Sequence, residues 1–562
     1  MVTPSLSKFL SLTTVRGGPT SREEKVEGSK SNEMIIEKDL MIPTRDGSPL
    51  CLNVFRPDGG VRVPVILCMS PYGKDMSVSL TMDRNRYFDS PYGKEADTSR
   101  HAIWETGDPS WWVPHGYAMV RVDSRGAFKS PGKRDFLSRK DQEDYYDMIE
   151  WCGTQPWSTG KVGLLGVSYY AMSQWPVAAR QPPHLAAIIP WEGMVDIYRE
   201  WGRQGGMYYC FTDFWWNFRY EAQGEDDKGE FVDWRKEFRK REFDDDWYAE
   251  RRADLSKITV PVLSVGNWGA FHMHLRGNVE GFMGVSSRHK RLLMAVGSHI
   301  GPFYTDWGNA EQKRFFDRWL KGEENGAEND PPVRLSIRHG TRVEWRDERE
   351  WPLARTRWTQ LYLDAASLSL GWKETSAEAK ITYPMPEGGA LFETAPIEKQ
   401  DVEITGPVAL RLWVSSSTED TDVFVSLRLI GEDGREISGI GPRGYPAQMA
   451  MGFLRASHRE LDPKRSLPYR PFHSHRRRLP LRPGEPTPLD IEIWPTCFVM
   501  APGQHLRLDI TANDKHMSAP TYGPYGHHDP EDKPAERFVG EVTIHTGGKY
   551  DSHLLVPIIP EK

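Results

Sequence analysis

The stretch from Lys161 to Trp175 constrains the fold of this chain more than any other segment. A short apolar run ends at Gly166, Ser168 follows two residues later, and a helix-compatible pattern begins at once. This order predicts a strand, a sharp turn and a helix, with Ser168 on the turn. Such a turn exposes the serine hydroxyl at the edge of a sheet, where the N–H groups at the start of the helix can hold an anion.

The same segment has the pattern of the nucleophile elbow of α/β-hydrolases, in which glycines stand two residues before and two residues after the serine. Tyr170 occupies the place of the second glycine. The tripeptide Gly166-Val167-Ser168 alone is also consistent with a strand that simply ends in a turn. The interpretation therefore depends on the surrounding sequence.

Short apolar runs alternate with helical patterns on both sides of the elbow, which predicts a parallel, doubly wound sheet. Two strands joined by a turn at Asp46-Gly47 come first. We expect the strand over 291–296 to be the last of this sheet. The other predicted elements are strands over 65–69, 117–122, 185–190 and 261–266 and helices over 141–151 and around 315–320.

Two later regions differ in composition. Residues 200–255 place many aromatic residues among charges; they predict a helical cap over the site, or else a helical subdomain that packs only on itself. Beyond a linker over 323–332, short alternating strands predict an antiparallel β-sandwich. The predicted organisation is a flexible arm (1–33), an α/β-hydrolase domain (34–330) containing the cap, and a jelly-roll-like β-sandwich domain (331–562).

Composition argues against several functions. The 562 residues carry a formal net charge of −7 with both signs interspersed, which gives no field suited to nucleic acid or an anionic membrane. Five scattered cysteines without a Cys-x-x-Cys spacing indicate reduced thiols in a cytoplasmic protein and no metal site. The start of the chain lacks an apolar leader, and no apolar run is long enough to span a membrane. No cofactor is expected.

A serine nucleophile needs a base, and the base needs an acid that orients it. His299 stands just after a glycine at the end of the predicted last strand. In an α/β-hydrolase this position allows the histidine to reach a serine at the end of the central strand. We therefore predict that Ser168 and His299 form a catalytic pair.

Several motifs are spread along most of the chain, from about residue 34 to residue 550. They include Pro43-Thr44-Arg45-Asp46-Gly47, Ser70-Pro71-Tyr72, Val122-Asp123-Ser124-Arg125-Gly126, Gly166-Val167-Ser168-Tyr169, Asp196-Ile197-Tyr198-Arg199 and His274-Leu275-Arg276-Gly277. In these motifs and their order the chain resembles the CocE/NonD family of serine hydrolases, which contains cocaine esterase and α-amino-acid ester hydrolases and is related to X-Pro dipeptidyl-peptidases. That family places tyrosine directly after the serine, as here.

The resemblance implies roles for individual residues. Ser168 would attack the acyl carbon and His299 would take its proton. The backbone N–H of Tyr169 and the hydroxyl of Tyr72 would form the oxyanion hole, with two donors aimed at the developing negative charge. The structural alternative for Tyr72 is a tyrosine packed at the end of a strand.

The chain departs from the family at the acid. The family carries aspartate in a Trp-x-Asp segment, and here Ala270 stands in its place. In some α/β-hydrolases the acid instead follows the strand directly after the elbow helix, which in this chain ends at Glu192. Glu192 is therefore the predicted acid, with Asp196 and Asp306 as further candidates. Helix capping or a salt bridge is the alternative role for Glu192.

These residues predict a metal-independent serine hydrolase that cleaves an ester or amide of a hydrophobic acyl or aryl group through an acyl-enzyme. An acyltransferase using the same serine is one alternative, and a binding protein that has lost catalysis is another. Dipeptidyl-peptidase activity is less favoured, because the sequence shows no acidic residues placed to hold a substrate ammonium. The expected partner is a small-molecule ester or amide, and the sequence leaves homo-oligomerisation open.

Overall fold

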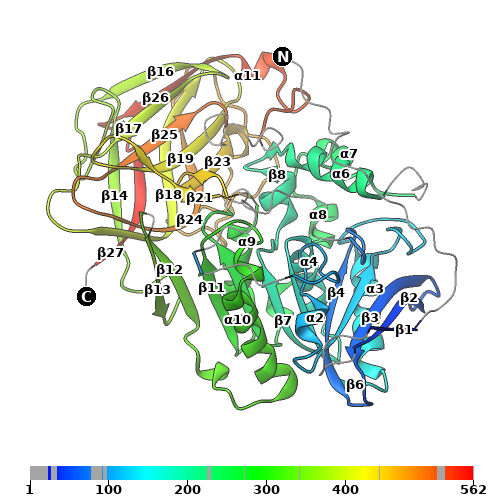
Figure 1. The fold of residues 1–562 in the computed structure, drawn as a ribbon. Helices are drawn as coiled ribbons and strands as arrows, with labels where there is room; N and C mark the ends of the chain where they lie inside the picture. Colours follow the sequence, from blue (N-terminus) through cyan, green and yellow to red (C-terminus); the bar gives the residue numbers. More distant parts are fainter. Residues whose placement is uncertain are drawn as a thin grey trace.

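The computed structural model describes residues 23–26, 34–76, 91–92, 98–223, 230–270, 273–340, 342–441, 444–514 and 526–560. The predicted flexible arm lies outside these residues except for β1 (Glu23–Val26), which pairs with β2 (Met34–Pro43). In Figure 1 the N-terminal half of the chain, blue to green, forms one body and the C-terminal half, yellow to red, forms a second body beside it.

A mostly parallel sheet forms the first body. Its strands lie in the order β2, β3, β5, β4, β6, β7, β10 and β11; β3 is antiparallel to its neighbours, and the strands from β5 to β11 are parallel. Parallel strands all end at the same edge, so the loops after β4, β6, β7, β10 and β11 meet there. These strands are β3 (Pro49–Pro57), β4 (Val63–Ser70), β5 (Ala118–Asp123), β6 (Ser158–Val167), β7 (Leu185–Trp191), β10 (Val262–Asn267) and β11 (Lys290–Ala295).

Helix α3 (Arg139–Thr154) shows why the sequence folds in this way. Ser138 caps its N-terminus by accepting a hydrogen bond from the backbone N–H of Asp141. Its apolar residues recur at helical spacing and join the buried cluster that contains Leu67 of β4 and Leu164 of β6. Burying each large apolar side chain stabilises the fold by about 1.5–3 kcal/mol. The buried apolar residues of α3 are Tyr145, Met148, Ile149 and Cys152.

The sheet continues beyond the predicted last strand. β12 (Val333–His339) pairs in parallel with β11, with Val333 opposite Leu292, whereas the sequence pattern had assigned it to the β-sandwich. Its sequence alternates apolar and polar residues, which suits a strand of either sheet, so the sequence pattern does not distinguish the two sheets. The far end of β12 reaches the second body, where Arg338 lies opposite Phe498 and donates to the carbonyl of Cys497.

The second body consists of β-strands paired almost entirely antiparallel. β18 pairs with β24, β26 and β27, and β19 pairs with β23 and β25. Leu410, Val425, Leu508 and Leu554 of these strands share one buried core. The strands named are β18 (Val402–Ser416), β19 (Asp422–Ile430), β23 (Ala450–Arg455), β24 (Thr487–Met500), β25 (His505–Thr511), β26 (Gly540–Thr546) and β27 (His553–Ile559).

The insertion between β7 and β10 contains helices α6 (Phe211–Gln223), α7 (Trp234–Lys240) and α8 (Asp246–Glu250). Trp215 and Trp234 stack with ring centroids 5.8 Å apart, so many of its aromatic residues pack on one another. Trp215 also donates from Nε1 to the Tyr72 hydroxyl of the sheet domain at 2.9 Å. The insertion is therefore both a self-packed helical unit and a cover on the edge of the sheet where the strands end.

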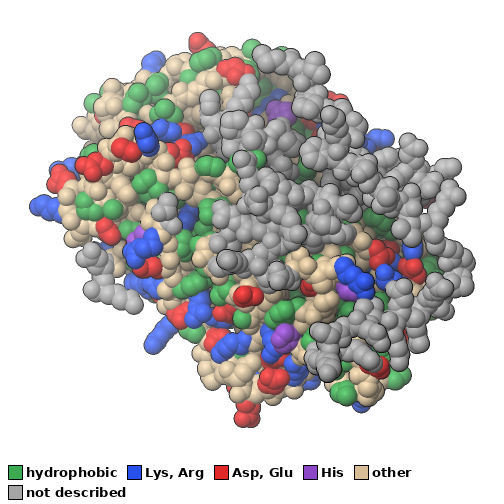
Figure 2. All heavy atoms as spheres, viewed as in Figure 1, with side chains coloured by type: hydrophobic (Ala, Val, Ile, Leu, Met, Phe, Trp, Pro, Cys, Tyr) green, Lys and Arg blue, Asp and Glu red, His purple; other side chains and the backbone are tan. Residues whose placement is uncertain are grey.

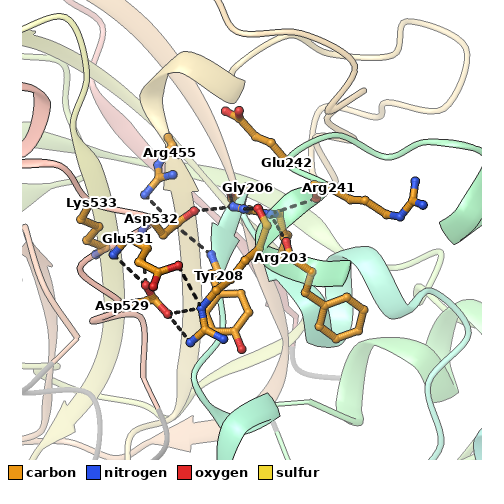
Figure 3. Close-up of polar contacts among 12 residues, drawn as sticks. Arg203, Gly206, Tyr208, Arg241, Glu242, Arg455, Asp529, Glu531, Asp532 and Lys533 are labelled. Carbon is orange, nitrogen blue, oxygen red and sulfur yellow. Dashed lines mark hydrogen bonds and ion pairs between the residues drawn. The ribbon is translucent and has the colours of Figure 1, made fainter. Parts of the chain in front are cut away.

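Buried ion pairs join this insertion to the second body (Figure 3). Arg203 of β8 (Arg203–Gln204) donates to Asp532 Oδ1 at 2.5 Å. Asp532 Oδ2 lies 2.9 Å from Arg455 and accepts the backbone N–H of Tyr208 at 3.1 Å. Because Asp532 pairs with Arg203 of the insertion and with Arg455 of the C-terminal domain, it fixes the insertion against that domain.

Asp532→Asn is expected to lower the free energy of unfolding by about 3–5 kcal/mol, because it leaves the buried guanidinium of Arg203 without its carboxylate partner, whereas Arg455 keeps Asp422. Burial alone would raise the pKa of Asp532, but Arg455 and Arg203 hold that pKa well below its usual range. Its stabilisation is therefore present above the pKa of an unfolded aspartate and is lost as the pH falls. Urea unfolding at pH 7 measures the loss in the variant, and the same measurement at about pH 3, below the pKa of an unfolded aspartate of about 3.9, measures the pH effect. The exposed Glu485→Gln is the control, and equal stabilities of wild type and Asp532→Asn at pH 7 would contradict this account.

On the face of the molecule in Figure 2, the coloured Lys and Arg side chains are interspersed with Asp and Glu. Within the described part of the chain, none of the helices combines the length and apolar character needed to span a bilayer. All five cysteines are buried and unpaired.

Candidate active site

Ser168 lies on the turn between β6 and α4 (Tyr169–Met172). Its backbone has φ 59° and ψ −117°, a conformation that costs a non-glycine residue on the order of 1–3 kcal/mol and is concentrated at functional sites. A Cβ on Gly166 would lie 2.4 Å from Cβ of Tyr170, so the tight turn requires glycine at position 166. The tyrosine at position 170 is tolerated because its side chain packs above that glycine.

His299 follows β11, and one of its ring nitrogens contacts the predicted acid. His299 Nδ1 lies 2.6 Å from Glu192 Oε2, and Glu192 directly follows the end of β7. The other oxygen of the buried Glu192 carboxylate accepts from Asn267 Nδ2 at 3.0 Å, at the end of β10. Residues that stand at the ends of β7, β10 and β11 therefore hold the imidazole in place.

The second nitrogen of His299 contacts a carboxylate that the sequence did not indicate. His299 Nε2 lies 3.2 Å from Oε1 of the buried Glu105. Burial alone would lower the pKa of His299, but Glu192 and Glu105 raise it to about 10. Burial raises the pKa of Glu105, and the bond to His299 opposes that shift.

A second histidine stands beside the serine. His274 Nε2 lies 3.4 Å from Ser168 Oγ, and the His274 ring stacks on His299 with centroids 5.0 Å apart and planes 9° apart. Burial, with His299 nearby, holds the pKa of His274 well below its usual range. Its Nδ1 is buried and has no hydrogen-bond partner in the described part of the chain.

The structure therefore differs from the simplest expectation, a direct hydrogen bond between Ser168 and His299. Both residues contact the His274 ring, and Nε2 of His299 is engaged by Glu105. Sequence reasoning gave no role to Glu105 or His274. His274 stands in a motif shared with the family, which is a signal that could have identified it, but Glu105 lies in an irregular segment that offers none.

The other acid candidates have different partners. Asp196 is bound by Arg199 at 2.8 Å and Arg252 at 2.9 Å. Asp306 is exposed in the first turn of α10 (Asp306–Phe316). Ala270 is buried, and its carbonyl accepts the backbone N–H of His274 at 3.0 Å.

Both predicted oxyanion-hole residues lie next to the elbow. Tyr169 is the first residue of α4, so its backbone N–H belongs to the start of that helix. Tyr72 follows β4, is buried, and meets the Tyr169 ring edge-on at 6.0 Å. Trp215 of the insertion holds the Tyr72 hydroxyl. In the described ranges, no group of three or more His, Cys, Asp or Glu side chains could hold a metal ion.

Comparisons with known proteins show the family to which the chain belongs. Residues 46–301 match the family of X-Pro dipeptidyl-peptidases (S15 family), and residues 325–555 match the X-Pro dipeptidyl-peptidase C-terminal non-catalytic domain. The structure of a CocE/NonD family hydrolase from Staphylococcus aureus has a TM-score of 0.87 to this chain and 33% sequence identity, with 94% of each chain covered. Cocaine esterase from Rhodococcus sp. is 26% identical over 630 residues, covering 93% of this chain and 98% of that protein. An α-amino acid ester hydrolase at 17% identity and TM-score 0.70, covering 98% of this chain and 100% of its own, shares the fold.

The fold, the elbow and these relatives define a serine hydrolase with a C-terminal domain. The chain belongs to the CocE/NonD family of hydrolases.

Proposed function

We propose that Ser168 attacks the carbonyl carbon of an ester or amide and forms an acyl-enzyme that water then hydrolyses. The observation that carries this proposal is the strained elbow that presents Ser168 beside a helix N-terminus, with the Glu192–His299 pair at the neighbouring strand ends. The serine proton passes to Nε2 of His299, which then gives it to the alcohol or amine that departs as the C–O or C–N bond of the substrate breaks. Glu192 accepts from Nδ1 and so leaves the lone pair of the neutral ring on Nε2, as a catalytic acid does for its base.

The oxyanion that forms on the carbonyl oxygen is proposed to bind the backbone N–H of Tyr169 and the hydroxyl of Tyr72. The Trp215 Nε1 donor occupies an acceptor site on the Tyr72 oxygen, which orients the phenolic proton as a donor for another partner. Donors fixed before the reaction stabilise developing charge without reorganisation.

Tyr72→Phe is expected to lower kcat by about 10²–10³-fold, the usual loss for one oxyanion-hole donor. KM should change little, because the bond strengthens when charge develops on the oxygen. Steady-state kinetics with a p-nitrophenyl ester measure both parameters. Tyr383→Phe, a buried tyrosine of the C-terminal domain core, is the matched control. An unchanged kcat for Tyr72→Phe would assign Tyr72 a packing role.

The proposed substrate carries a hydrophobic acyl or aryl group. The side chains packed next to the elbow are aromatic: Tyr169 stacks parallel to Trp215, and Phe136 meets both rings edge-on. Such rings bind flat apolar groups through dispersion and burial. A relative named cocaine esterase is consistent with an ester that bears an aryl group.

Labelling with a fluorophosphonate probe tests the proposal, because only an activated serine reacts. We expect one label, on Ser168, and none in heat-denatured protein. Product analysis with and without added alcohol then separates hydrolysis from acyl transfer, since an acyltransferase would give mostly the alcohol ester. Absence of labelling in folded protein would refute the acyl-enzyme proposal.

A further inference from the structure

We propose that Glu105 is a positioning residue that holds Nε2 of His299 away from Ser168 in the free enzyme, so that catalysis requires this contact to be exchanged for one with Ser168 Oγ. This inference rests on the proposed function, in which His299 is the general base. It adds a second carboxylate that acts on the opposite side of the ring from Glu192.

The neutral ring of His299 has fewer N–H donors than carboxylate neighbours. A neutral imidazole has one N–H donor, whereas His299 meets a carboxylate at each nitrogen, 2.6 Å from Glu192 and 3.2 Å from Glu105. Two ionised carboxylates are both satisfied only by the protonated ring. A protonated ring has no lone pair and cannot take the proton of Ser168, so this arrangement is a resting state.

The contacts of His299 with Glu192 and with Glu105 differ in length. Charge-assisted N–H···O bonds normally measure about 2.7–2.9 Å, so the Glu192 contact is short and the Glu105 contact is long. Glu192 is also fixed by Asn267 through its other oxygen. Glu105 is therefore the weaker partner and the one that His299 releases.

A backbone hydrogen bond links Glu105 to the nucleophile elbow. The carbonyl of Glu105 accepts the backbone N–H of Val167 at 2.9 Å, one residue before the nucleophile. The backbone of Glu105 has φ 61°, a conformation unfavourable for a non-glycine residue. The strained backbone and the bond to Val167 fix Glu105 next to Ser168. The Glu105 carboxylate is therefore held among the side chains that take part in the proposed reaction.

In this resting state Ser168 contacts His274. Its hydroxyl lies against His274 Nε2 at 3.4 Å, and His299 stacks on the same His274 ring. A 3.4 Å contact is longer than the usual range for a hydrogen bond to a hydroxyl and costs little to break. Ser168 and His299 therefore both lie against the His274 ring before His299 exchanges Glu105 for Ser168.

The charged and titratable groups around this contact set the direction of the pH effect. Glu192, Glu105 and His274 face His299, and Tyr170 and Tyr304 lie near Glu105. The two carboxylates together raise the pKa of His299 to about 10. Removing one of them lowers that pKa, so more of the enzyme holds a neutral base at pH 7.

The test is the pH dependence of kcat/KM for a p-nitrophenyl ester. In the wild type, the acid limb should have its midpoint clearly above the usual histidine value of about 6.5. In Glu105→Gln the midpoint should fall by at least about one pH unit, with a several-fold gain in kcat/KM at pH 7. Glu105→Asp, which keeps the charge, should return the midpoint toward the wild-type value, and the half-exposed Glu323→Gln should leave it unchanged.

An unshifted midpoint in a folded, fluorophosphonate-reactive Glu105→Gln would overturn the role of Glu105 and leave the serine chemistry intact. Loss of labelling in the wild type would overturn both. If Glu105→Gln does not fold, the pH dependence of phosphonylation of the wild type decides. A midpoint at or below about 6.5 contradicts the resting state, and a midpoint clearly above it supports it.

Discussion

Ser168→Ala is expected to lower kcat by about 10⁶-fold, the loss seen when a serine protease loses its nucleophile. Alanine keeps the strained backbone turn but removes the atom that forms the acyl bond. A residual rate about 10³–10⁴-fold above the uncatalysed reaction should remain, because the oxyanion donors and substrate binding are untouched. Initial rates with a p-nitrophenyl ester at high enzyme concentration measure both limits.

Ser173→Ala is the matched control for this experiment. Ser173 ends the first turn after the elbow and is buried, and its hydroxyl donates to the carbonyl of Tyr170 at 3.4 Å. Its loss should leave kcat within a few-fold of wild type. Retention of more than a tenth of the activity by Ser168→Ala would mean that another group is the nucleophile.

Glu192→Gln is expected to lower kcat by about 10⁴-fold, as replacing the triad acid by its amide does in serine proteases. The geometry supplies the reason. Asn267 donates to one oxygen of Glu192, so the glutamine oxygen would turn toward Asn267 and its NH₂ group toward His299 Nδ1. His299 would then carry its proton on Nε2, the tautomer that cannot accept a proton from Ser168.

The control for Glu192→Gln is Asp306→Asn, because Asp306 is the alternative candidate that is exposed on α10. Steady-state kinetics at several pH values should show an unchanged kcat for this variant. A loss below about tenfold in folded Glu192→Gln would contradict its role as the acid. Thermal unfolding of both variants separates misfolding from lost chemistry.

We propose that the catalytic acid of this chain has moved from one strand end to a neighbouring one. Ala270 stands after β10, where the family carries aspartate, and Glu192 stands after β7, the next strand in the sheet. The end of β10 still contributes, because Asn267 fixes the Glu192 carboxylate. Both strands end at the same edge of a parallel sheet, so either can reach the same histidine nitrogen.

Because neighbouring parallel strands end at the same edge of the sheet, much of the candidate site could be predicted from the sequence. Ser168, His299 and Glu192 each follow a buried apolar strand, and the order of strands in a parallel sheet is enough to bring their ends together. The serine-hydrolase class and the family were also correctly predicted, because the motifs that carry them lie at those strand ends. Periodicity and topology therefore predict the residues that stand at the ends of regular elements.

The rest depends on contacts without such a pattern. Glu105 lies in an irregular segment 194 residues from His299 in sequence, and neither spacing nor composition indicates that they meet. Likewise β12 alternates like any half-buried strand, and only its pairing with β11 shows that it extends the parallel sheet. Tertiary contacts of irregular segments and the choice between two sheet edges are decided by the whole fold.

The central claim is that Ser168 is activated by His299 while Glu192 holds the opposite side of the ring. A crystal structure of the enzyme with a phosphonate bound covalently at the active site tests it most directly. We predict phosphorus bonded to Ser168 Oγ, His299 Nε2 hydrogen-bonded to an oxygen of the adduct, and Nδ1 still on Glu192. An adduct whose oxygen is held by His274 while His299 remains on Glu105 would contradict the account.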